Sequence, residues 1–146
     1  MILVALYWLP VLIWMGVIYT LSDRPDLTLS RVLPVFASGH SARGLDLADL
    51  LLRKIAHVTE YAILTFLVFR ALRCRRTGPP GRSLFGWSGL FSVAYAFTDE
   101  LHQRFVPTRS GTLRDVVIDT AGVLLALAVL RIRSSPGEEN VPSGRR

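Results

Sequence analysis

The first 21 residues of the chain carry no charged side chain, and this feature restricts most strongly what the chain can fold into. A bilayer-spanning α-helix needs about 20 mostly apolar residues. A secretory signal peptide would add basic residues ahead of the apolar run and a small-residue cleavage site after it, and the sequence contains neither. We therefore expect residues 2–21 to form a retained transmembrane helix.

Three further apolar segments follow, each preceded by polar sequence, and they predict helices at about residues 49–72, 84–105 and 112–131. Hydrophobic residues make up 51% of the 146 residues, which is a high share for a water-soluble domain. The expected fold is therefore an all-α, integral membrane four-helix bundle over residues 1–133. Residues 134–146 have little apolar content and are expected to form a disordered cytoplasmic tail.

The sequence also suggests where two of these helices begin. Either Asp46 or Asp49 can cap the helix expected at 49–72, because a short acidic side chain accepts hydrogen bonds from the first backbone N–H groups. Thr112 and Asp115 have the spacing of a capping box, so we expect Thr112 to start the last helix.

The expected orientation in the membrane depends on where lysine and arginine residues gather. With four spans the two sides carry nearly equal numbers of basic residues, but residues 70–83 hold five arginines and no acidic residue. We therefore place this loop and both termini in the cytoplasm. The same arginines, and the net charge of +6, are expected to contact anionic membrane lipids rather than nucleic acid.

Ionisable residues interrupt two of the expected spans. Between Lys54 and Arg70, and again between Asp119 and Arg131, the chain is shorter than the about 20 residues that a span needs. These helices must therefore hold polar side chains at membrane depth, where each charge costs roughly 2.5–3.5 kcal/mol near the bilayer centre. That cost predicts that the polar groups face one another rather than lipid.

Helical spacing gathers the polar residues of each helix on one face. On three of the helices this face forms a stripe along the helix, and each stripe becomes polar at the end expected on the non-cytoplasmic side. On the last helix the stripe continues into Gly122 and Ala126, whose small side chains allow another helix to approach closely. The residues expected to meet at one depth are His57, Glu60, Tyr61, Asp99, Gln103, Asp115 and Asp119.

A histidine among several carboxyl groups suits acid–base catalysis, because one acid can stay protonated while another group accepts a proton. Basic side chains beside them suit a phosphate or a carboxylate, which arginine binds through two hydrogen bonds. The candidate catalytic residues are His57, Glu60, Asp99, Glu100, Asp115 and Asp119. The candidate substrate-binding residues are Lys54, Tyr61, Gln103, Arg104 and Arg109.

Three other interpretations of the same residues stay open. The cluster can bind a lipid head group or a cell-wall precursor without catalysis, or it can be a buried polar network that only holds the helices together. A metal site is a weaker alternative to a metal-free one, and its four ligands would be His57, Glu60, Asp99 and His102, from two helices. The sequence identifies no cofactor and does not settle whether the protein is an enzyme.

The segments "RKIAHVTEYAIL" and "DELHQRFVPTRSGTLRDVVIDTAG" resemble the VanZ-like family of small bacterial membrane proteins. The matching residues are Lys54, His57, Glu60, Tyr61, Asp99, Glu100, Gln103, Phe105, Pro107, Arg109, Asp115, Asp119 and Gly122. The end of the first helix, "WMGVIYTLSDRP", is also similar, with Ser22–Asp23 where the family usually has Ser-Ser or Ser-Gln. The resemblance covers nearly all of the four-helix region.

This resemblance implies a multi-pass protein of the bacterial inner membrane. The founding member of the family is associated with low-level resistance to the glycopeptide teicoplanin. The expected partners are membrane lipids and a lipid-linked cell-wall precursor or a lipoglycopeptide. The family resemblance implies no particular reaction, and it leaves the oligomeric state open.

Overall fold

The computed structural model describes residues 2–23, 42–74, 76–106 and 112–134, and within these ranges all regular secondary structure is α-helical. This agrees with the expected all-α fold of four helices. The helices are α1 (Ile2–Ser22), α4 (Ala42–Arg73), α5 (Arg82–Gln103) and α6 (Leu113–Ser134). The residues expected to form the tail lie outside the described part of the chain, apart from Ser134, which ends α6.

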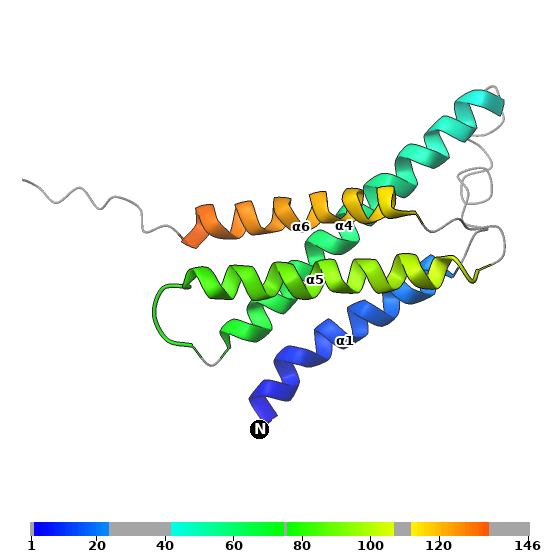
Figure 1. The fold of residues 1–146 in the computed structure, drawn as a ribbon. Helices are drawn as coiled ribbons and strands as arrows, with labels where there is room; N and C mark the ends of the chain where they lie inside the picture. The colour runs from blue at the N-terminus through cyan, green and yellow to red at the C-terminus, as the bar shows by residue number, and fades with distance from the viewer. Residues whose placement is uncertain (1, 24–41, 75, 107–111, 135–146) are drawn as a thin grey trace, which may run out of the picture.

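Helices α4 and α5 each contact the other three helices, and the packing of α4 on α6 is the most extensive. Helices α5 and α6 lie side by side, and α4 crosses both of them (Figure 1). Helix α1 packs on α4 and α5. The chain therefore brings the end of α1, the end of α5 and the start of α6 to one end of the bundle (Figure 1).

Helix α4 begins at Ala42, well before the expected start near residue 49. Asp46 and Asp49 therefore lie inside the helix, and the prediction that one of them caps it is wrong. The physical reason is that the segment from Ala42 to Asp49 contains alanine, leucine and arginine, which favour helix, and no proline to stop it. The first turns of α4 project beyond the other helices (Figure 1).

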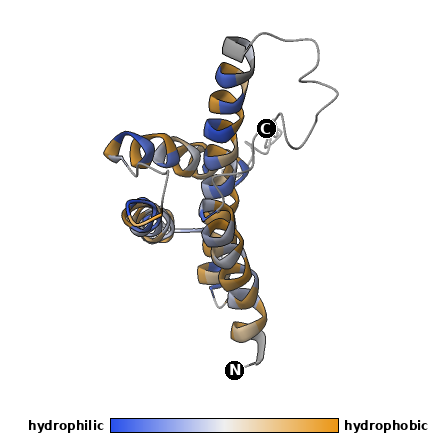
Figure 2. Ribbon diagram, turned by 90° about the vertical axis from the view of Figure 1, so that its right-hand side faces the viewer, coloured by the Kyte–Doolittle hydropathy of each residue, from blue (hydrophilic) through white to orange (hydrophobic). Residues whose placement is uncertain are grey.

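The surface of the bundle is rich in apolar side chains, while many polar side chains are buried. Large exposed hydrophobic residues occur on all four helices, among them Leu12, Ile55, Trp87 and Leu124, and hydrophobic positions recur along the helices (Figure 2). By length and composition two helices can cross a membrane, over Val4–Ser22 and Asp46–Arg73. The buried polar residues are Ser22, His57, Thr65, Ser88, Ser92, Asp99, Glu100, Gln103 and Asp119.

The apolar core lies where α1, α4, α5 and α6 meet, and it includes Ile18, Tyr61, Leu64, Ala96 and Val123. Two hydrogen bonds attach α1 to this core. The Trp14 indole donates to the Glu60 carbonyl oxygen at 2.9 Å, and the Tyr95 hydroxyl donates to the Met15 carbonyl oxygen at 2.7 Å. Both bonds use backbone acceptors of a neighbouring helix, so they stabilise the packing of α1 beyond its apolar contacts.

Gly122 allows the close approach of α6 to α4. A Cβ atom added at this position would overlap the carbonyl oxygen of Val58 and lie 2.9 Å from its carbonyl carbon. These are backbone atoms of α4, which cannot move aside as a side chain can. The role expected for Gly122 as a small residue at a helix contact agrees with this geometry.

Candidate functional site

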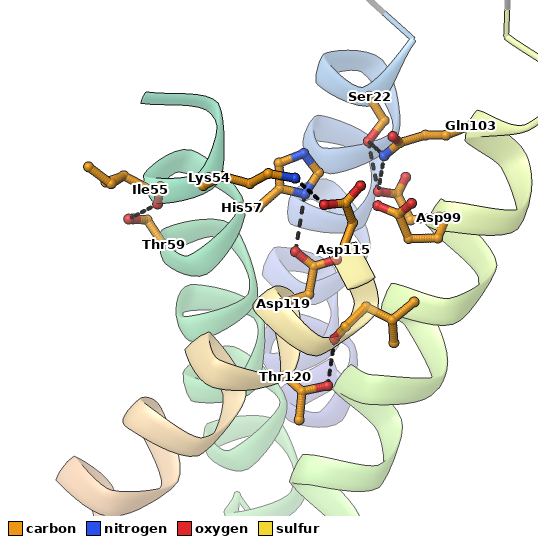
Figure 3. A network of polar contacts seen from close by, with 12 residues as sticks. Ser22, Lys54, Ile55, His57, Thr59, Asp99, Gln103, Asp115, Asp119 and Thr120 are labelled. Carbon is orange, nitrogen blue, oxygen red and sulfur yellow. Dashed lines mark hydrogen bonds and ion pairs between the residues drawn. The ribbon is translucent and has the colours of Figure 1, made fainter. Parts of the chain in front are cut away.

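Polar side chains from all four helices gather at the end of the bundle where α1 and α5 finish and α6 begins (Figure 3). Helix α1 contributes Ser22, α4 contributes Lys54 and His57, α5 contributes Asp99 and Gln103, and α6 contributes Asp115 and Asp119. We call this group, together with Glu100, the polar cluster. The structure thus brings polar residues from several helices together at one end of the bundle, as the helical spacing predicted.

The centre of the cluster is a contact between His57 and Asp119. The imidazole Nδ1 lies 3.1 Å from Oδ1 of Asp119, which is fully buried. His57 and Asp119 face each other because each lies on the inner face of its helix where α4 and α6 pack together. A carboxylate bound to Nδ1 holds the imidazole in one tautomer and leaves Nε2 as the proton acceptor.

Glu100 lies beside this pair and also closes the start of α6. Its Oε2 accepts a hydrogen bond of 2.9 Å from the backbone N–H of Thr112, the residue before α6. A negative charge at a helix N-terminus is favourable because the first N–H groups carry partial positive charge. Ligand atoms of His57, Glu100 and Asp119 all lie within 4.8 Å of one another.

Lys54 and Asp115 form a second pair between α4 and α6, one turn nearer the start of α6. The Lys54 side chain is 31% exposed and the Asp115 side chain 19% exposed, whereas the Asp119 side chain is fully buried. The Lys54–Asp115 pair therefore lies at the rim of the cluster and Asp119 lies inside it. Asp115 also accepts a hydrogen bond of 3.0 Å from the Thr112 hydroxyl. The Thr112 oxygen is 3.4 Å from the Asp115 N–H, so Thr112 precedes α6 as the capping spacing predicted.

Asp99 belongs to a separate set of contacts that joins α5 to α1. Its Oδ2 accepts hydrogen bonds from the Ser22 hydroxyl at 2.8 Å and from the Gln103 amide at 3.1 Å. The Gln103 amide nitrogen also lies 3.3 Å from the Ser22 hydroxyl oxygen. Ser22 was not among the residues expected at the site. Two sequence signals pointed to it: its position as a polar residue at the end of a charge-free helix, and its place in the segment "WMGVIYTLSDRP" that resembles the family.

The remaining predicted site residues take varied positions. Tyr61 is fully buried in the apolar core, 6.5 Å from Tyr95 between ring centroids. Glu60 is half-buried on α4, and Arg104 is exposed just after α5. Arg109 lies outside the described residues, so its predicted place at the site stays a prediction.

The structure brings together a different set of possible metal ligands from the one considered in the sequence, and the two sets share only His57. Among the described residues, the close group is His57, Glu100 and Asp119. Asp99 and His102 are not in this group: Oδ2 of Asp99 accepts hydrogen bonds from Ser22 and Gln103, and the His102 ring lies against Tyr19 with centroids 4.5 Å apart. Helix spacing could not distinguish these sets, because the choice depends on how α6 docks between α4 and α5.

Three buried carboxylate oxygens in the cluster have no hydrogen-bond partner among the described residues. They are Oδ1 of Asp99, Oε1 of Glu100 and Oδ2 of Asp119. An unpaired buried carboxylate oxygen is unfavourable, and a proton, a water molecule, a cation or a ligand can satisfy each of these atoms. The arrangement can therefore bind a cation, or transfer protons between His57 and the nearby carboxyl groups.

Comparison with known proteins gives one match. The model of the VanZ/LLP1 family matches residues 3–134, which covers all four helices and the whole polar cluster. Searches of curated proteins and of solved structures found no match. The resemblance seen in the sequence motifs is confirmed, and the chain belongs to the VanZ/LLP1 family.

Proposed function

We propose that this VanZ/LLP1 protein is a multi-pass inner-membrane protein that acts by acid–base catalysis on a lipid-linked molecule of the bacterial cell envelope. The observation that carries the proposal is the group formed by His57, Asp119 and Glu100. It combines an oriented imidazole with a second carboxyl group less than 5 Å away. Pairs of titratable groups in different surroundings are the usual basis for a separate acid and base.

Each of these groups has a distinct role in the proposed reaction. His57 Nε2 removes a proton from an attacking hydroxyl group or water, whose oxygen forms a bond to a phosphorus or carbonyl carbon atom. The leaving oxygen departs with the electron pair of the broken bond and takes a proton from Oε1 of Glu100. His57 then returns the proton to Glu100 through a water molecule, so both groups are restored. Asp119 stabilises the protonated imidazole.

The polarity of the cluster also supports an anionic substrate. Lys54 lies at the partly exposed rim, where an ammonium group attracts a phosphate or a carboxylate. Arg104 and Arg109 follow α5 in the sequence, and we propose that they contribute further positive charge. The His57 side chain is 11% exposed. We propose that the substrate reaches the imidazole from the rim of the cluster, where Lys54 lies.

The exposed apolar surface supports the placement in a membrane. Two helices are long and apolar enough to span, and the buried residues include nine polar or charged ones. A molecule with its polar groups inside and its apolar groups outside is stable in lipid rather than water. We place the arginine-rich loop between α4 and α5 in the cytoplasm, which puts the polar cluster at the outer side, near envelope precursors.

A second candidate function is a metal-dependent form of the same chemistry. The unpartnered oxygens of Glu100 and Asp119 favour it, because a bound divalent cation would satisfy both. A His nitrogen and carboxylate oxygens are ligand types that zinc accepts, and a catalytic zinc site has three protein ligands and a further position for water. In that case His57, Glu100 and Asp119 would hold the cation, which would supply Lewis-acid activation of the attacking water.

Turnover of lipid-linked wall precursors by the purified full chain tests the proposal. We expect His57→Gln to lose turnover while Thr59→Ala, an exposed change on the same helix, retains it. Saturable binding without product in the wild type would show a binder instead of an enzyme. If chelation abolishes turnover and one divalent metal restores it, the metal-dependent candidate replaces the metal-free one.

The proposed link to glycopeptide resistance needs a test in cells. We expect expression of the wild-type chain to raise the concentration of teicoplanin needed to stop growth, and His57→Gln to abolish the increase at equal membrane abundance. An equal increase from the variant would show that the polar cluster is not involved in resistance.

A further inference from the structure

A pocket of about 450 Å³ lies at the end of the bundle opposite the polar cluster. Helices α4 and α6 finish there (Figure 1). Four arginines line the pocket, Arg70, Arg73 and Arg76 from the end of α4 and just beyond it, and Arg133 from α6. Among the described residues that line the pocket none is acidic, so these side chains give it a positive charge.

One of these arginines is held in place by an aromatic ring. The guanidinium carbon of Arg70 lies 4.9 Å from the centroid of the Tyr7 ring on α1, a distance typical of a cation–π contact. Tyr7 lines the same pocket. Arginines in the last turn of a helix also interact favourably with the helix dipole. The helix dipole alone does not explain why arginines from two different helices line the same pocket.

An apolar groove of about 400 Å³ adjoins this pocket. All of its lining residues come from α4 and α6, and Ala62, Ile63 and Val129 are typical of them. The groove and the pocket share three lining residues, which are Phe66, Leu130 and Arg133. A continuous surface therefore runs from an apolar channel between two helices to a cavity lined with arginines.

We propose that this surface is a binding site for one anionic phospholipid. The phosphate of the head group occupies the arginine-lined pocket, and an acyl chain lies in the groove between α4 and α6. Guanidinium groups bind phosphate through paired hydrogen bonds, and basic pockets between transmembrane helices bind anionic head groups. This site is separate from the polar cluster and does not depend on the proposed catalytic function.

Lipid retention by the full chain in detergent, measured by native mass spectrometry, tests the proposal. The probes are a phosphatidylglycerol and a phosphatidylcholine with the same acyl chains, and inorganic phosphate. We expect phosphatidylglycerol to bind more tightly than phosphatidylcholine. Inorganic phosphate should not displace it, because phosphate cannot occupy the groove. Equal binding of the two lipids, or displacement by phosphate at millimolar concentration, would overturn the proposal.

Two variants with matched controls test the two halves of the site. Arg133→Gln should weaken phosphatidylglycerol binding about fivefold, which corresponds to about 1 kcal/mol for one arginine near anionic lipid. Arg131→Gln removes the same charge from the same helix, but Arg131 does not line the pocket, so binding should be retained. An equal loss in both variants would show general charge attraction and contradict a defined pocket.

The groove is tested by Ala62→Trp, which fills it, against Ala56→Trp, an exposed position on the same helix outside the groove. Ala62→Trp should reduce retention of both lipids, while Ala56→Trp should leave it unchanged. Thermal unfolding in detergent checks that each variant is folded. Unchanged retention by folded Ala62→Trp protein would exclude the groove as the acyl-chain site.

Discussion

The imidazole Nδ1 of His57 lies 3.1 Å from Oδ1 of Asp119, and this buried contact joins α4 to α6. The two residues are far apart in the sequence and lie on helices that pack directly on each other. If Asp119 serves only to join the helices, its loss should change stability alone. If it positions the imidazole, the loss should change the chemistry of His57.

The Asp119→Asn variant distinguishes these two roles. Asparagine keeps the shape but not the charge, so the imidazole loses the group that stabilises its protonated form. We expect turnover to fall about a hundredfold or more, with the substrate concentration for half-maximal rate nearly unchanged. The nitrogen NMR signals of His57 should also show a changed tautomer. Lower stability with an unchanged tautomer and rate would indicate a purely structural contact.

Gly122→Ala tests the close approach of α6 to α4. The added methyl group would overlap backbone atoms of Val58, so we expect the free energy of unfolding to fall by about 1–3 kcal/mol. Gly86→Ala is the matched control, because nothing lies within 4 Å of a Cβ atom added there. Alanine favours helix over glycine by up to about 1 kcal/mol, so the control should be neutral or stabilising. Denaturation with dodecyl sulfate in mixed micelles measures both, and equal stability of the two variants would contradict the packing described.

Glu100 accepts a hydrogen bond from the start of α6 and is the acid of the proposed reaction, and two substitutions can distinguish these roles. Glutamine at this position retains a side-chain oxygen to accept the Thr112 N–H bond, but it cannot donate a carboxyl proton or provide a carboxylate to a metal. We expect Glu100→Gln to fold with wild-type stability and to lose turnover. Glu100→Ala removes the cap as well, and should cost about 0.5–2 kcal/mol of stability in addition. Full turnover by Glu100→Gln would exclude Glu100 as the acid.

Ser22→Ala tests the connection between α1 and α5. The substitution removes the hydrogen bond to Asp99 Oδ2, and this buried oxygen then keeps the hydrogen bond from the Gln103 amide. We expect a loss of about 1–3 kcal/mol in stability. Thr20→Ala, an exposed change on the same helix whose hydroxyl bonds only within α1, should change stability little. Unfolding curves that coincide for the two variants would show that the Ser22 bond does not hold α1 in place.

Local pattern was enough to predict four helices, their apolar outer surfaces and the end of the bundle where polar groups meet. These features depend on residues close together in the chain, such as His57 with Tyr61 or Thr112 with Asp115, because helical periodicity decides which side chains share a face. The family motifs depend on the same local spacing. The start of α4 was missed because propensity near a polar segment is a weak guide to a helix boundary.

Only the packing of the helices decided which polar residues touch. Periodicity placed His57, Asp99, Asp115 and Asp119 in one group without assigning contacts. The packing of α6 on α4, close at Gly122, brings Asp119 to the His57 imidazole. The same docking places Glu100 against the first turn of α6 and Ser22 against Asp99. Contacts between helices depend on crossing angle and distance, which side chains from several segments determine together, and no single segment of the sequence contains that information.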